Sequence, residues 1–457
     1  MIIVSFVSFV LLWFHYFTLL CQFILEGVKT MTYEESLTYL ANLTKFGINL
    51  GLARIEKLLE LMDHPERKFK TIHIAGTNGK GSTTAMLASI LRASGINTGM
   101  YTSPHLSAYT ERMIVNGKEI TPDQFGEAIA YTSRFMDKIV AQGLGHPTEF
   151  EVLTAAAFYY FAACGVEYAV IEVGLGGLLD STNVIMPEIS VITNVTLDHT
   201  DKCGNTVREI AHHKSGIIKK NVPVITGAQG EALDVIKNIS QKSAAICYVY
   251  REDFSATFLE MEGECQRIMV AVGTERKAVP FLVNLLGGHQ VDNCAVAVMT
   301  AMVLGKNEKR IDLSAIEKGL LTVRWPGRFE VMPGRPTVII DGAHNPDGMR
   351  ALRENLDRFC KGKNIVFLLG ILQDKDVKTM VMTLIRSQDK VVVVAPMSER
   401  AGKPEIVARE IKAEHVEVAS SIEEGVKRAK LLAGEDDILC VAGSLYLIGA
   451  VRKIICS

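Results

Sequence analysis

The segment TIHIAGTNGKGSTT, Thr71 to Thr84, joins a short apolar run to a glycine-rich turn and then to the start of a helical pattern. It is close to the pattern of a phosphate-binding loop but departs from it twice. That pattern has a glycine five residues before its Gly-Lys pair and a Ser or Thr directly after the lysine. Here Ile74 occupies the first of these places and Gly81 follows Lys80.

The local context still favours an anion site. Backbone N–H groups in such a turn, together with the positive end of the following helix, attract phosphate, and Lys80 adds a point charge. Glycine-rich turns also occur without ligands, but a lysine flanked by glycines after a buried strand serves no packing purpose. We therefore expect the loop to bind a nucleotide, ATP, through the residues Asn78, Gly79, Lys80, Gly81 and Ser82.

Composition limits the alternatives. The 457 residues leave room for two or three domains, and 48% hydrophobic with 22% charged residues is an ordinary globular balance. A net charge of -2 gives no basic footprint, which argues against a nucleic-acid partner. The nine cysteines are scattered without a C-x-x-C pair, which is typical of a reducing cytoplasm.

The first thirty residues differ from the rest. The run MIIVSFVSFVLLWFHYFTLLCQFIL has no charged residue and is long enough to span a bilayer, yet it lacks the basic start of a secretory signal. Three interpretations stay open: an upstream extension with Met31 as the true first residue, a membrane anchor, or a buried helix. Only the second would bring contact with a membrane.

From Thr71 onward, short apolar runs alternate with helical patterns, which predicts mostly parallel sheets covered by helices. The expected strands of a first domain are 71–75, 168–173, 189–195 and 222–226, with helices at 151–164 and 207–219 and hairpins within 244–273. The expected strands of a second domain are 337–341, 364–370, 391–395, 415–419 and 438–442. The Pro and Gly of RWPGRFE (324–330) suggest a linker, so we expect an extension at 1–30 and domains at 31–327 and 328–457.

Further motifs follow the loop in order. They are TSPHL (102–106), PTEFE (147–151), EVGLGGLLDSTN (172–183), LDHTD (197–201), HHKSGIIK (212–219), GGHQVDN (287–293), DGAHNPDG (341–348), LQDKD (372–376) and GSLYLIG (443–449). This set resembles the folylpolyglutamate synthase and dihydrofolate synthase family of the Mur ligase superfamily, from Met31 to the end of the chain. GTNGKGS followed by DGAHNP is highly specific for it.

The resemblance implies an α/β fold, with a P-loop type ATPase domain followed by a smaller Rossmann-like domain. It also implies a reaction: ATP phosphorylates a carboxylate of a folate or dihydropteroate, and the amine of L-glutamate displaces phosphate from the acyl phosphate. Two anions must approach each other in such a reaction, so metal ions and cationic groups have to neutralise them. We expect a monomeric cytoplasmic enzyme that uses ATP and two Mg²⁺ sites.

Site residues can be carried over from the family one by one. Ser103, Glu151 and His199 fall where the family binds magnesium, and their oxygen and imidazole groups suit that ion. Taken alone, a His after a strand is more often a structural residue than a ligand, and Glu151 is more readily explained as a charge at a helix start. By position alone, Lys214 is a surface lysine at the end of a helical run. The resemblance instead matches it to a lysine that carbon dioxide carbamylates, which would turn a cation into an anionic metal ligand.

The second half supplies the other expected contacts. The resemblance assigns Asn293 to the adenine side of ATP, and Arg328 and Asp341 to contacts with ATP from the linker and the second domain. His344 is the candidate contact for the incoming glutamate. The alternative for Asp341 is an ordinary capping role after its strand.

Two residues depart from the family pattern. Leu178 stands where the family commonly has arginine, and His213 stands where it commonly has an acidic residue. The first removes a cation near the expected site, so a catalytically impaired, membrane-anchored nucleotide-binding protein is one alternative. Another Mur-type amino acid ligase is the second alternative, although the roughly forty residues between Met31 and the loop are too few for an additional domain.

Overall fold

The computed structural model describes residues 30–47, 49–198, 200–273, 277–398 and 400–456. The chain divides into two compact units, one formed by residues up to 66 with 121–160, and one by 67–120 with 161–457. Each is described by itself. The hydrophobic run at 1–29 lies outside the described residues, and within those residues no helix is both long and apolar enough to cross a membrane.

The first unit is helical. Its helices are α2 (Tyr33–Leu43), α3 (Ala53–Leu61), α5 (Pro122–Ser133), α6 (Met136–Ala141) and the larger part of α7 (Glu149–Ala163). Helix α2 begins at a capping box in which Thr32 and Glu35 satisfy each other's backbone N–H groups. Thr121 caps α5 in the same way, with Gln124 as its partner.

The second unit contains an eight-stranded sheet of order β4-β3-β2-β5-β1-β6-β7-β8. Its strands are β1 (Lys70–Ala75), β2 (Thr98–Tyr101), β3 (Met113–Val115), β4 (Lys118–Glu119), β5 (Tyr168–Glu172), β6 (Ile189–Ile192), β7 (Val224–Thr226) and β8 (Cys247–Val249). All neighbours pair in parallel except β2 with β3 and β3 with β4. The apolar run that follows Lys70 is β1, a central strand buried from Thr71 to Ala75, which is why it reads as continuously apolar.

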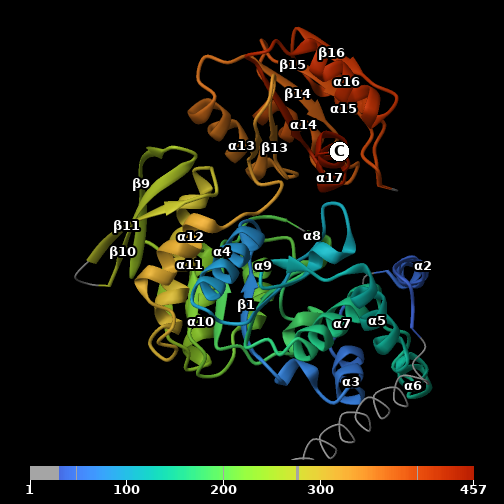
Figure 1. The fold of residues 1–457 in the computed structure, drawn as a ribbon, viewed down its shortest axis with the longest axis vertical. Coiled ribbons are helices and arrows are strands. Elements are labelled where there is room, and N and C mark those ends of the chain that lie inside the picture. The colour runs from blue at the N-terminus through green and yellow to red at the C-terminus, as the bar shows by residue number, and fades with distance from the viewer. Residues whose placement is uncertain (1–29, 48, 199, 274–276, 399, 457) are drawn as a thin grey trace, which may run out of the picture. The chain divides into compact units, whose positions relative to one another are not determined.

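Helices pack on both faces of this sheet. They are α4 (Lys80–Ala93), α8 (Thr200–Cys203), α9 (Val207–Lys214), α10 (Gly230–Lys242), α11 (His289–Leu304) and α12 (Leu313–Thr322). The side chains of Ile72 and Ile74 share one core with α4, α11 and α12. Figure 1 shows these three helices beside β1. The strands β9 (Phe254–Glu262), β10 (Cys265–Val272) and β11 (Lys277–Val283) form a separate antiparallel sheet whose apolar side belongs to the same core.

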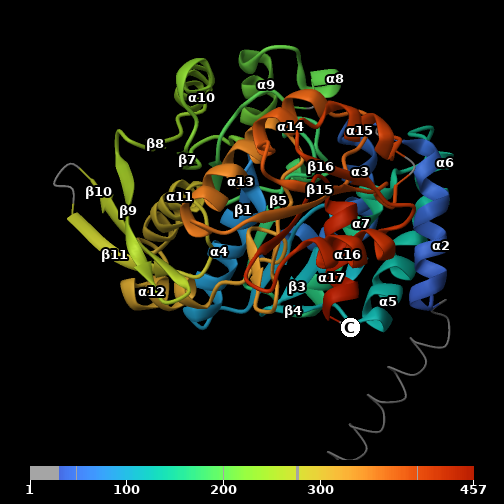
Figure 2. The same ribbon diagram turned by 90° about the horizontal axis from the view of Figure 1, so that it is seen from above.

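A six-stranded sheet of order β12-β13-β17-β14-β15-β16 follows. Its strands are β12 (Glu330–Met332), β13 (Thr337–Ile340), β14 (Ile365–Leu369), β15 (Lys390–Val393), β16 (His415–Val418) and β17 (Ile438–Ala442). Alternate residues of β14 face alternate cores. One core contains α13 (Pro346–Phe359), α14 (Val377–Leu384) and α15 (Pro404–Glu410), and the other contains α16 (Ile422–Leu432) and α17 (Leu445–Cys456) (Figure 2).

The expected fold class is confirmed, because each large sheet is mostly parallel and covered by helices. All nine strands expected from the apolar runs exist, with ends that differ by up to three residues. The helix expected at 207–219 is too long. It ends at Lys214 and continues as a 3-10 turn, Ser215–Ile217, where Gly216 packs tightly against Leu178.

Candidate functional site

The loop after β1 has the geometry that a phosphate site needs. Gly76 has a φ of 152°, and Gly79 has a φ of 81°, in the left-handed region where a side chain is strained. A Cβ at Gly79 would also collide with the side chain of Asn293. Helix α4 begins directly at Lys80, so its first backbone N–H groups point toward the loop.

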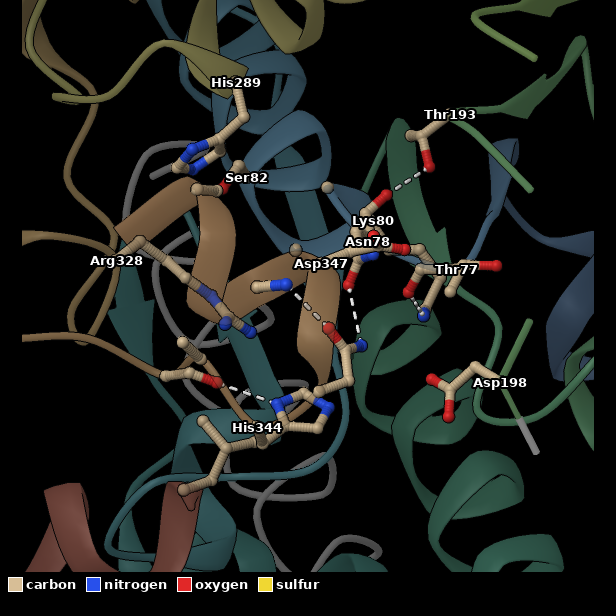
Figure 3. A pocket seen from close by; sticks show the side chains of 18 of the residues that line it. Thr77, Asn78, Lys80, Ser82, Thr193, Asp198, His289, Arg328, His344 and Asp347 are labelled. Atoms are coloured by element: carbon tan, nitrogen blue, oxygen red, sulfur yellow. Dashed lines mark hydrogen bonds between the residues drawn. The ribbon is translucent and has the colours of Figure 1, made fainter. Parts of the chain in front are cut away.

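A cavity of about 500 Å³ opens at this loop within the second unit. It brings together residues that follow strands of both large sheets and residues in the first turns of helices. Figure 3 labels ten of the residues that line it. The predicted residues that line it are Asn78, Gly79, Lys80, Gly81, Ser82, Ser103, Asn293, Arg328, Asp341 and His344. A space of this size suits a nucleotide with part of a second substrate.

Lys80 lies at the loop itself. Its Nζ donates to the carbonyl oxygens of Gly76 at 3.1 Å and Thr77 at 3.2 Å. The ammonium is therefore held at the edge of the cavity, beside the N-terminus of α4. Both groups are positive, so together they can bind and neutralise phosphate oxygens.

Lys214 approaches the same loop from α9. Its buried Nζ donates to the Gly76 carbonyl oxygen at 2.8 Å. Burial, and then the nearby charge of Lys80, lowers the pKa of Lys214 from 10.5 to about 7. The residue also borders a small cavity that includes Gly176 and Asp198. Near neutral pH a large share of this amine is uncharged and nucleophilic.

Glu172 is a site residue to which the sequence analysis gave no role. It ends β5, lines the cavity and accepts a hydrogen bond from the backbone N–H of Ser103. Burial raises the pKa of the Glu172 carboxyl to about 7, against the opposing effect of the charges on Lys80 and Arg328. The sequence did contain a signal for Glu172, because it is an acidic residue at the end of an expected strand. The carboxyl ends of parallel strands such as β5 and β1 lie at one edge of the sheet, where ligands bind.

Glu151 has a different environment. Its carboxylate accepts hydrogen bonds from the backbone N–H and hydroxyl of Thr148 at 2.7 and 2.9 Å, and pairs with Arg54 at 3.1 Å. These contacts make it a buried cap of its own helix in the first unit, and it is absent from the residues that line the cavity. Its assignment as a metal ligand remains a prediction.

His199 lies outside the described residues, so its predicted role is also untested. Across the remaining described chain, no group of three or more His, Cys, Asp or Glu side chains is arranged to hold a metal ion. The adjacent Asp198 does line the cavity, and its carboxylate lies 3.8 Å from the amine of Lys375.

Asn293 belongs to a hydrogen-bonded chain that ends at α4. Its Nδ2 donates to Gln290 Oε1 at 2.9 Å, and Gln290 Nε2 donates to Ser82 Oγ at 3.2 Å. Gln290 and Asn293 are one turn apart on α11, so this helix fixes the position of the first turn of α4. Asn293 thereby lies at the cavity wall next to Gly79.

Asp341 organises the backbone around Arg328. One carboxylate oxygen accepts the N–H of Phe329 and the other accepts the N–H of Ala343, each at 2.8 Å. Phe329 has a φ of 47°, a strained value for a residue that is not glycine. The capping alternative for Asp341 is wrong, because the N-cap of α13 is Asn345 and Asp341 binds the loop backbone instead.

His344 follows in the same loop. Its Nδ1 donates to the Gly342 carbonyl oxygen at 2.7 Å, which leaves Nε2 as an acceptor in the neutral ring. Burial, aided by the charges of Arg328 and Lys375, lowers the pKa of His344 to about 4, although its bond to Gly342 opposes the shift. Asn345 then reaches across the cavity, with its Nδ2 3.3 Å from Asn78 Oδ1.

The two departures from the family pattern lie against the segment that carries Lys214. The backbone N–H of Leu178 donates to the His213 carbonyl oxygen at 2.8 Å, while its side chain is 38% exposed. Burial and the charge of Lys214 lower the pKa of His213. Leu178 thus contacts the segment through its backbone, and its side chain brings no charge.

Comparison with known families gives two matches. Residues 74–301 match the Mur ligase middle domain, and residues 327–445 match the Mur ligase, glutamate ligase domain. With a phosphate loop and a DGAHN loop on one cavity, the fold and the site define an ATP-dependent ligase of the Mur type.

Individual relatives narrow this class. The dihydrofolate synthase/folylpolyglutamate synthase of Bacillus subtilis is 33% identical over 92% of this chain and 98% of its own length. The folylpolyglutamate synthase of Lacticaseibacillus casei is 34% identical over 93% of this chain and 98% of its own length. The structure of Mycobacterium tuberculosis folylpolyglutamate synthase complexed with ADP aligns with a TM-score of 0.86 at 30% identity, over 93% and 99% of the two chains. This chain belongs to the folylpolyglutamate synthase/dihydrofolate synthase family.

Proposed function

We propose that the chain joins the amino group of L-glutamate to a carboxyl group of a folate or dihydropteroate, with ATP as the activating substrate. The observation that supports this most directly is the shared cavity. The loop of Lys80 and the loop of His344 line one space, so a nucleotide and an amino acid can meet there. The names of the relatives, which include both synthase activities, support the same chemistry.

In the first step, a carboxylate oxygen of the folate attacks the γ-phosphorus of ATP. The new O–P bond forms as the bond to ADP breaks, and the product is an acyl phosphate. Lys80 and the N-terminus of α4 stabilise the transferring group because they place positive charge on its oxygens. Arg328 also lines the cavity and supplies a further cation.

In the second step, the glutamate amine attacks the acyl carbon, and the bond to phosphate breaks to leave an amide. The amine must lose its protons as the new bond forms. Neutral His344 has an unprotonated Nε2 beside the cavity, which suits a group that accepts a hydrogen bond from the incoming amine.

Magnesium fits the donors at this site. Ser103 and Glu172 present oxygen atoms to the cavity beside Lys80, and hard oxygen donors are what this ion prefers. We infer that Glu172, rather than Glu151, provides the carboxylate, with His199 and carbamylated Lys214 at a second ion. Bound Mg²⁺ would neutralise the γ-phosphate and the substrate carboxylate as they approach.

The remaining expectations belong to the same proposal. They are domains at 31–327 and 328–457, a monomer, and a cytoplasmic location. The eight described cysteines are all free, which is compatible with a reducing compartment.

One experiment tests the function. The purified chain is incubated with ATP, magnesium and L-glutamate, and either dihydropteroate or tetrahydrofolate, while phosphate release and product mass are followed. We expect one phosphate per amide formed, with a mass increase of one glutamyl unit. Nucleotide binding without any new amide from either substrate would contradict the proposal.

A further inference from the structure

The loop from Ser103 to Ala108 connects the cavity with α17, the last helix of the chain. At one end, Ser103 and Pro104 line the cavity, and the Ser103 N–H donates to Glu172. At the other end, Leu106 packs against the core between the six-stranded sheet and its helices α16 and α17. One short segment therefore touches both the reacting site and the second sheet.

A single carboxylate holds this loop in shape. Glu111 accepts three consecutive backbone N–H groups, those of Leu106 at 2.7 Å, Ser107 at 2.8 Å and Ala108 at 2.9 Å. Hydrogen bonds to an ionised acceptor are stronger than those between neutral groups. The neighbouring Arg112 adds a fourth contact, since its Nε donates to His105 Nδ1 at 2.9 Å.

The loop also fits closely against α17. Ser107 Oγ donates to the Gly449 carbonyl oxygen at 3.2 Å, and Lys453 Nζ donates to the Ser107 carbonyl oxygen at 3.1 Å. A Cβ at Gly449 would collide with the carbonyl oxygen of Leu106. The absence of a side chain at Gly449 is thus what allows the backbones to meet.

We propose that Glu111 and Gly449 are positioning residues, and that the loop they hold couples the position of the second sheet to Ser103 and Glu172. Glu111 makes the loop rigid, and Gly449 lets it rest on α17. A displacement of α17 is then transmitted to the oxygen donors beside Lys80. The expected change in turnover rests on the proposed function, whereas the expected change in loop rigidity does not.

Two substitutions test the rigidity of the loop and its contact with α17 separately. Glu111→Gln replaces one acceptor oxygen with an NH2 group that faces a backbone N–H, so at least one of the three bonds is lost. Gly449→Ala adds a methyl group at the contact while favouring the helix itself, because alanine is the better helix former. The matched control is Glu424→Gln, since Glu424 accepts the Ser420 N–H at 2.8 Å in an exposed cap of α16.

The first measurement is turnover. We expect kcat to fall by about tenfold or more in both variants, while KM for ATP and the Kd of a non-hydrolysable ATP analogue change by less than about twofold, because small displacements at a reacting site are costly. The Glu424→Gln control should keep the wild-type values. Wild-type kcat in both test variants would overturn the proposal, as would a loss of kcat that is matched by weaker analogue binding.

The second measurement does not depend on activity. Hydrogen exchange of the peptide spanning 103–112 should be at least about tenfold faster in Glu111→Gln, and faster in Gly449→Ala, than in the wild-type chain. Unchanged exchange in both would overturn the proposal even if turnover fell. If the wild-type chain makes no amide yet exchange changes as expected, the proposed function fails and the loop assignment stands. If Glu111→Gln does not fold, Gly449→Ala decides both measurements.

Discussion

Carbamylation of Lys214 is the prediction that depends most directly on the structure. Carbon dioxide reacts only with an uncharged amine: the nitrogen forms a bond to carbon, one proton is released, and an anionic carbamate results. At pH 7 an ordinary lysine is about 0.03% uncharged, whereas a lysine with a pKa of about 7 is about half uncharged, so the reactive share rises about a thousandfold. An anion at this position would also replace repulsion from Lys80 by attraction.

The perturbation is Lys214→Ala, assayed with ATP, glutamate and a folate substrate. We expect amide formation to be lost, while the affinity for an ATP analogue remains nearly unchanged. Millimolar acetate should partly restore activity, because its carboxylate can occupy the space left by the side chain. Lys214→Met is the matched control: its longer side chain fills that space, so acetate should have no effect.

Stability distinguishes this role from a structural one. The folded pKa of Lys214 lies below the unfolded value of 10.5, so the unfolded chain binds more protons between pH 7 and 10.5, and this group adds stability as the pH rises through that window. A shift of this size corresponds to a cost of up to about 5 kcal/mol near pH 7 for the unmodified amine. Lys214→Met should therefore be at least as stable as wild type in denaturant at pH 7. Full activity of Lys214→Ala without acetate would refute the reasoning, and lost activity without rescue would require the carbamate to be seen directly by mass.

Four further outcomes are expected. Lys80→Ala should fold normally and lower turnover by roughly a hundredfold or more, since a positioned charge on a phosphoryl group contributes a few kcal/mol; near-normal turnover of the folded variant would contradict this. Asp341→Asn should lower the free energy of unfolding by about 1–3 kcal/mol in urea titration, because one of two buried N–H acceptors is lost. If residues 1–30 are an upstream extension, a chain that begins at Met31 should match the full chain in activity and thermal stability, and loss of folding would show that the preceding residues are packed against the protein. Saturating ATP analogue and folate should reduce the radius of gyration in small-angle scattering if closure precedes catalysis, and an unchanged radius would count against closure.

Local sequence determined much of the fold. The run from Ile438 to Ala442 is a strand with the predicted ends, and the glycine pattern after Thr71 placed the loop and α4 within a few residues. These segments are buried on both faces, so their apolar runs are continuous. The shorter strands β2 to β4 were missed because two to four residues carry too little periodicity to be distinguished from a loop.

Which acidic residue belongs to the site could be identified only from the tertiary structure. Glu151 and Glu172 are both acids beside apolar runs, and spacing along the chain does not distinguish them. The pairing of β5 between β1 and β2 places Glu172 next to Ser103 and near Lys80, whereas Glu151 caps a helix in the other unit. The order of strands in a sheet depends on packing between residues far apart in the sequence, so it cannot be predicted from a local motif.

The sequence by itself determined the chemical class, because the phosphate loop and the DGAHN motif need particular residues at particular spacings. Only the tertiary structure decided how deeply the site residues are buried and how far their pKa values are shifted. By its position in the chain Lys214 is a surface lysine at a helix end, yet burial and the charge of Lys80 lower the pKa of its amine to about 7. The cost of desolvating a charge depends on what surrounds it in space, and the chain order of the surrounding residues does not contain that information.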